Sequence, residues 1–383
     1  MVAVVAFAAG LFVVVSVLAS SVVTVVLPRG VRTRIGRVVF ITVRILFKVR
    51  IRSSTSYETR DRVLALYAPI SLLALLGTWV IGLMAGYTAM MWAVGVHPLR
   101  AAFTMAAGSL TTLGLLTPHT LPQIVLAISA AVFGLGELAL LITFLPNIYS
   151  DLHRRERDVT KLRTSAGQPP EGVNILVRLH RLERLDARTE LWVQWTDWFV
   201  EVEEAQTAFL ALSFFRSSQP EFSWVTASGA VLDGAALAAS CLALPRDYEA
   251  ELCIRTGYLF LRRMADLFGL PFDPDPAPTD PIAVTQEEFD EVYGRMADAG
   301  LPLRARDESW RDFAGWRVNY DEVLIRLANL VEAPVAAITL ARRSRSASAW
   351  RAMARSSSGG SWMSRTSTWR TATPHTSTDA SIT

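Results

Sequence analysis

The sequence predicts an all-α integral membrane protein that carries a helical domain on the cytoplasmic side. The mean hydropathy of +0.30, with 51% hydrophobic residues, is too high for an ordinary soluble chain. The apolar excess lies before residue 150, and the basic residues gather beside the ends of the apolar segments. No strand-like run survives in the remainder, where apolar residues recur with the period of a helix. We divide the chain into five parts: 1–27, 28–62, 63–149, 150–340 and 341–383.

The first part is an N-terminal transmembrane helix. Val2 to Leu27 contains no charged residue and exceeds the roughly 20 residues that a spanning helix needs. A cleaved signal peptide would carry its basic residues first, whereas here they begin at Arg29. We therefore expect a retained helix with its N-terminus outside the cell.

The second part, 28–62, is the most basic segment, and basic loops beside membrane helices stay in the cytoplasm. A helical wheel at 100° per residue separates two faces within it. The basic face carries Arg34, Arg37, Arg44, Lys48 and Arg52, and the apolar face carries Val38, Ile41, Ile45 and Val49. We predict an amphipathic helix that lies on the anionic lipids of the inner leaflet. A solvated basic loop is the alternative.

The third part places a short apolar run between two segments that are long enough to cross a bilayer. These segments are Leu64–Val94 and Gln123–Pro146. The run between them, LRAAFTMAAGSLTTLGLLTP, ends in a threonine and glycine signature formed by Thr111, Thr112, Leu113, Gly114 and Leu115. A glycine beside a small hydroxyl residue lets the backbone adopt unusual torsions and approach an ion closely. Irregular backbone at membrane depth is tolerated where it lines a water-filled cavity.

This helix, short helix, loop and helix plan resembles the pore-loop, two-helix-pore superfamily of potassium channels. It is closer still to actinobacterial membrane proteins described as potassium-channel-like, which share FRSSQPEFSW, VLDGAALA and FAGWRVNYD. The resemblance implies a selectivity filter at 111–115, whose carbonyl oxygens replace the hydration shell of a cation. Leu115 and Leu116 replace the usual aromatic residue and second glycine, so the loop is closer to the single-glycine loops of Trk-type potassium transporters.

Three residues of the second flanking segment are candidates for the inner pore. Gly134 and Gly136 lie where channels of this plan bend to open, although close helix packing explains them equally well. Glu137 is a carboxylate deep in a spanning segment, which is costly and marks a functional candidate. We favour slightly a role in attracting cations over an ion pair with an arginine of segment 28–62.

The fourth part, 150–340, reads as a cytoplasmic all-α domain. Segment 222–244 is apolar, but no basic flank distinguishes its ends, so we expect a buried core helix in preference to a fourth span. Thr285–Glu288 is a capping box that opens a helix ending near Gly300. The proline-rich stretch 270–281 excludes a helix. We read 312–321, DFAGWRVNYD, as a packed helix junction rather than a ligand site.

The chain lacks the motifs of a P-loop, a dinucleotide site, a zinc protease and a serine hydrolase, so we expect neither an enzyme nor a bound cofactor. Cys241 and Cys253 match no metal spacing and are expected to be buried thiols. The sequence contains no basic stripe with interleaved aromatic residues, so we expect no nucleic-acid binding.

The tail, 341–383, is rich in serine, threonine and arginine and is predicted to be disordered.

These predictions combine into a passive cation channel of the cell membrane, with potassium as the permeant ion. One pore loop cannot surround an axis, so a conducting form requires a homotetramer. The alternative is a non-conducting signalling or scaffold protein that is anchored in the membrane and acts through its helical domain.

Overall fold

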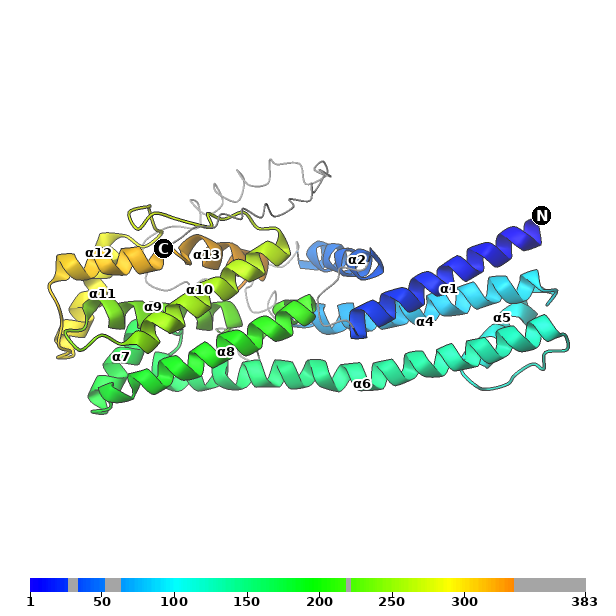
Figure 1. Cartoon of the computed structure of the whole chain (residues 1–383), viewed down its shortest axis with the longest axis horizontal. Coiled ribbons are helices and arrows are strands. Elements are labelled where there is room, and N and C mark those ends of the chain that lie inside the picture. The colour runs from blue at the N-terminus through cyan, green and yellow to red at the C-terminus, as the bar shows by residue number, and fades with distance from the viewer. Residues whose placement is uncertain (27–33, 52–62, 218–221, 334–383) are drawn as a thin grey trace, which may run out of the picture. The chain divides into compact units, whose positions relative to one another are not determined.

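The computed structural model describes residues 1–26, 34–51, 63–217 and 222–333, which form helices and no β-strand (Figure 1). This confirms the all-α prediction for these residues. The predicted tail and both ends of the basic segment, 28–33 and 52–62, lie outside them. The helices of the apolar half are α1 (Val2–Val26), α2 (Arg34–Ile51), α4 (Tyr67–Ala93), α5 (Leu99–Leu110) and α6 (Leu121–Ala166). The remaining helices are α7 (Gly172–Arg181), η1 (Leu185–Ala187), α8 (Arg188–Ala208), η2 (Leu210–Phe214), α9 (Trp224–Cys241), α10 (Tyr248–Phe268), α11 (Gln286–Asp298), α12 (Arg306–Arg317) and α13 (Asp321–Leu330).

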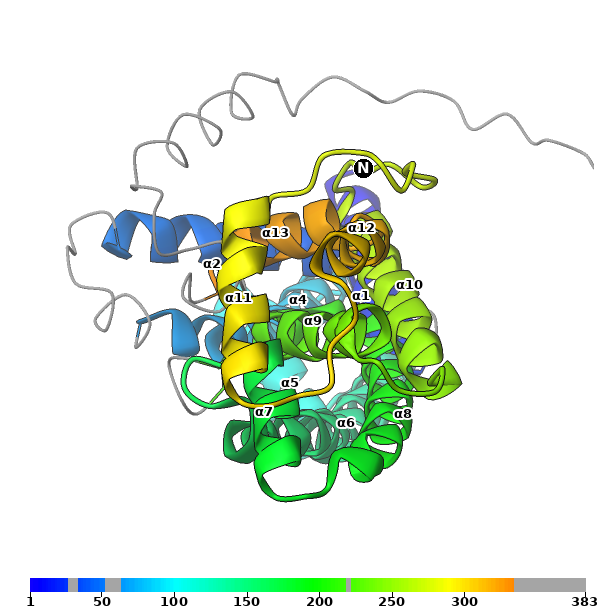
Figure 2. The same ribbon diagram turned by 90° about the vertical axis from the view of Figure 1, so that its left-hand side faces the viewer.

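Four helices are long and apolar enough to cross a membrane, namely α1, α4, α6 and α9. Almost every residue of α9 is buried inside the protein. In Figure 2, α9 lies among α7, α8, α10 and α12, which cover it with their own apolar faces. Segment 222–244 therefore contributes the central helix of the helical domain, as its lack of basic flanks indicated.

Helices α1 and α4 pack closely through small residues. A Cβ atom added to Gly10 would lie 2.6 Å from the carbonyl oxygen of Gly86, and one added to Gly82 would lie 2.7 Å from a methyl carbon of Val17. Such contacts bring two backbones together where no water drives association. Helix α4 thus packs on α1 at Gly82 and Gly86. An added Cβ at Gly77, on the same helix, would meet no neighbour within 4 Å.

Helix α6 is continuous from Leu121 to Ala166 and passes through Pro146, where we expected the second spanning segment to end. A proline removes one backbone hydrogen bond, and here packing on both sides keeps the helix intact. Beyond Pro146, Val159 and Leu162 belong to the core of the helical domain. Arg155 of α6 is buried and donates hydrogen bonds to the carbonyl oxygens of Leu212 and Phe215, each at 2.8 Å.

The helical domain has an aromatic core that includes three tryptophans of α8, and a buried polar junction at 312–321. Arg317 pairs with Asp233 of α9 and donates from Nε to Asp321 at 2.8 Å. Tyr320 donates its hydroxyl to Asp233 at 2.9 Å. Burial opposes the charged guanidinium, but the two carboxylates outweigh it and raise the pKa of Arg317 above its usual value. The junction locks α9, α12 and α13 together, as the sequence interpretation of a packed junction required.

Two smaller predictions are also confirmed in the helical domain. Thr285 and Glu288 form the capping box at the start of α11, and Gly300 follows the helix with φ +82°. Both cysteines are buried and free. Burial raises the pKa of the Cys253 thiol to about 12, so this residue is inert towards thiol reagents in the folded protein.

Candidate functional site

Helix α5 turns back from the end of α4 and lies between α4 and α6 (Figure 1). Its last residue contacts the middle of the apolar part of α6, because a Cβ atom added to Gly134 would lie 2.2 Å from the carbonyl oxygen of Leu110. Gly134 is 13 residues past Leu121 (134 − 121), which corresponds to about 20 Å along the helix axis. The carboxyl end of α5 therefore packs against α6 about 20 Å from the start of that helix, measured along its axis.

Polar contacts hold the two flanking helices around α5. Gln123 is buried at the start of α6, accepts the His119 N–H at 3.1 Å and donates to the Val94 carbonyl oxygen at 3.5 Å. Tyr87 of α4 donates its hydroxyl to Ser129 of α6 at 3.3 Å. Gln123 was not among the site residues predicted from the sequence. A lone amide side chain at the start of an apolar helix was the signal that could have identified it.

The predicted filter begins at the C-terminal cap of α5. Thr112 has φ +59° and Gly114 has φ +60°, whereas Thr111 has φ −89°. The Thr112 N–H donates to Ser109 and the Gly114 N–H to Gly108, both at 3.1 Å. A left-handed residue that caps a helix is usually glycine. A β-branched residue at positive φ is a strained outlier, and such strain gathers at functional sites.

Gly108 allows the loop to fold back over the end of α5. A Cβ atom at Gly108 would lie 2.9 Å from the backbone nitrogen of Leu115. Gly108 was not among the predicted site residues, although a glycine inside a short apolar helix signals a close approach of backbone. Gly108 and Gly134 therefore determine where the loop can lie.

All five predicted filter residues are exposed in the single chain. Leu113 is 67% exposed and Leu115 is 56% exposed, and Thr111, Thr112 and Gly114 are exposed as well. Leu116, which follows them, is 40% exposed. The loop thus leaves a largely apolar surface that no other described residue of the chain covers.

The three inner-pore candidates separate in the structure. Gly134 is a packing glycine against α5, and Gly136 has open space around its Cα. Glu137 is only 4% exposed and lies beside Ser21 of α1, so it faces the interior of the chain and not the exposed side that holds Gly136. No arginine of the described residues donates a hydrogen bond to its carboxylate oxygens. In the single chain the Glu137 side chain is therefore buried, and its role in attracting cations stays a prediction.

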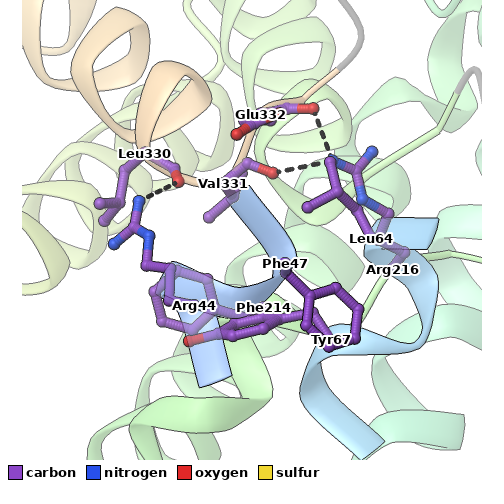
Figure 3. Close-up of a pocket in the computed structure, with 9 residues that line it drawn as sticks. All are labelled: Arg44, Phe47, Leu64, Tyr67, Phe214, Arg216, Leu330, Val331 and Glu332. Atoms are coloured by element: carbon purple, nitrogen blue, oxygen red, sulfur yellow. Dashed lines mark hydrogen bonds between the residues drawn. The ribbon is translucent and has the colours of Figure 1, made fainter. Parts of the chain in front are cut away.

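The basic segment forms the predicted helix α2, with a different orientation for one residue. Arg34, Arg37, Val38, Ile41, Ile45 and Val49 are exposed. Arg44, which we expected to face lipid, is half-buried between α2 and the helical domain: it donates to the Leu330 carbonyl oxygen at 3.5 Å and lies 5.9 Å from the centre of the Phe214 ring (Figure 3). The physical reason is that the end of α13 supplies carbonyl groups that attract a cation. The side chain of Lys48 and all of Arg52 lie outside the described residues.

Arg216 completes the contact between this region and α13. It donates to the carbonyl oxygens of Val331, at 3.3 Å, and Glu332, at 3.0 Å, as Figure 3 shows.

No group of three or more potential metal-ligating side chains occurs among the described residues. No known protein family, curated protein or solved structure matches this chain.

Proposed function

We propose that the chain is one protomer of a cation-conducting pore, with potassium as the permeant ion and residues 111–115 as the filter. The observation that carries the proposal is the strained, exposed loop at the carboxyl end of a short helix that packs on the middle of α6. Carbonyl oxygens of such a loop replace the hydration shell of an ion. The carboxyl end of α5 adds a partial negative charge beside the loop, which favours a cation.

The proposal requires three spans, namely α1, α4 and the first part of α6, with the loop entering from the outer side. The N-terminus is then outside, and the basic segment 28–62 and the helical domain are in the cytoplasm of a cell membrane, as the distribution of arginine favours. Four protomers surround the ion path, and the exposed loop and the exposed side of α6 face one another across the axis.

Cysteine labelling tests this topology. His97 and His153 are both exposed, and the two native cysteines are buried, so introduced thiols give a clean signal. In intact cells a membrane-impermeant thiol reagent should label His97→Cys but not His153→Cys. The second variant should be labelled only after the cells are permeabilised with detergent. Equal labelling of the two variants would contradict the three-span arrangement.

Substitution of the filter glycine tests conduction. Gly114 needs a left-handed torsion, which costs an alanine about 1–2 kcal/mol, although its Cβ would meet no neighbour within 4 Å. We expect Gly114→Ala to abolish potassium flux into liposomes without loss of the folded protein. Thr112→Val removes the hydroxyl that donates to the Thr111 carbonyl at 2.7 Å and should alter selectivity or conductance more than assembly.

Leu116→Gly is the complementary variant, because it moves the loop towards a conventional potassium filter and should preserve or increase flux. The scaffold alternative predicts that none of these substitutions has a functional effect. A folded, tetrameric wild-type protein with no flux above empty vesicles would rule out the channel and leave that alternative.

A further inference from the structure

A cavity of about 420 Å³ lies where α1, α2, α4 and the connection from α8 to η2 meet. Its wall is mainly apolar and includes Phe40, Leu75, Phe209, Phe214 and Phe268. Arg37 and Arg44 are the charged residues among the described residues of the wall, which include no aspartate or glutamate. The cavity therefore combines an apolar wall that suits hydrocarbon with positive charge that no carboxylate of the described wall residues offsets.

The cavity lies near the ends of the apolar helices. Val23 and Thr24 come from the last turn of α1, and Tyr67 begins α4. In the topology proposed above, these ends face the cytoplasm beside the basic segment. The cavity then lies at the level where the acyl chains of the inner leaflet meet their headgroups.

The two arginines are placed to bind one phosphate group. They are seven residues apart on α2 (44 − 37), so they share a face about 10 Å apart along the axis. Arg37 is exposed and pairs with no carboxylate of the described residues. Arg44 lies over Phe214 and has donors beyond the one directed at Leu330 (Figure 3). Arginine side chains are long enough to converge on one phosphate across this spacing.

We propose that this cavity binds one anionic phospholipid of the cytoplasmic leaflet, with an acyl chain against the phenylalanines and the phosphate between Arg37 and Arg44. The inference rests on the membrane placement proposed above and not on conduction. Such a lipid contacts α1 and α4 on one side and Phe209 of the helical domain on the other. It is thereby a structural link between the spanning helices and the cytoplasmic helices.

Native mass spectrometry of the full-length protein in mild detergent tests the proposal, with dioleoylphosphatidylglycerol and dioleoylphosphatidylcholine as probes. We expect at least fivefold tighter binding of the anionic lipid, since each basic residue near anionic lipid contributes about that factor. Arg37→Gln should lose about fivefold in affinity for phosphatidylglycerol, because one of the two charges is removed. Arg34→Gln is the matched control, because Arg34 is exposed on the same helix and does not line the cavity.

A second variant separates the cavity from general surface charge. Ala208→Leu fills part of the wall without a change in charge and should weaken binding of both lipids. Equal affinity for the two lipids would overturn the proposal, as would equal losses in Arg34→Gln and Arg37→Gln, or full retention in Ala208→Leu. Melting temperatures within about 2 °C of wild type confirm that each variant is folded. Because the readout is binding, a protein that conducts no ions can still pass this test.

Discussion

Replacing Gly134 by alanine should destabilise the protein and abolish any potassium flux, although Gly134 is not part of the proposed filter 111–115. The new methyl carbon would lie 2.2 Å from the Leu110 carbonyl oxygen, which is backbone and cannot rotate away. Helix α5 or α6 must shift, and overpacking of this kind costs about 1–3 kcal/mol. Thermal unfolding in detergent, followed by tryptophan fluorescence, measures the loss of stability, and liposome flux measures the function.

Gly136→Ala is the matched control for this prediction. Gly136 lies two residues further along the same helix, and its added Cβ would meet nothing within 4 Å. We expect its stability to stay within about 0.5 kcal/mol of wild type. Similar melting temperatures for the two variants would contradict the packing of α5 on α6.

Arg317→Met should produce the largest loss of stability in the helical domain. The substitution leaves Asp233 and Asp321 buried without their cation, and breaking such a pair costs about 3–5 kcal/mol. Thermal unfolding of the detergent-solubilised full chain is the measurement. Adding Asp233→Asn to Arg317→Met should recover part of the loss, because the two residues interact directly.

Arg326→Met is the control, since Arg326 forms an i,i+4 pair with Glu322 on an exposed surface of α13. Exposed pairs of this kind contribute less than about 0.5 kcal/mol. The interpretation of the junction fails if the two arginine variants melt at the same temperature, or if the double variant is no more stable than Arg317→Met.

The helices followed from the sequence because their signals are local. Apolar length predicted α1 and α4, and the Thr285 capping box predicted the start of α11. The aromatic and charged run 312–321 indicated a packed helix junction, whereas only the structure shows that Arg317 of this run pairs with Asp233 of α9. The threonine and glycine signature also indicated which loop would be irregular. The positive φ of Gly114 could be expected from its residue type, whereas that of Thr112 could not.

The features that the sequence left open depend on which face of a helix meets a neighbour. Pro146 is an ordinary end signal, but packing beyond it keeps α6 intact as far as Ala166. Arg44 shares a helical face with residues expected to bind lipid, yet the end of α13 supplies carbonyl oxygen for it. Glu137 lies in the expected segment, and only the position of α1 turns it inward. Composition and periodicity therefore determined the helices of this protein, whereas contacts between distant residues decided their lengths, their faces and the place of the loop.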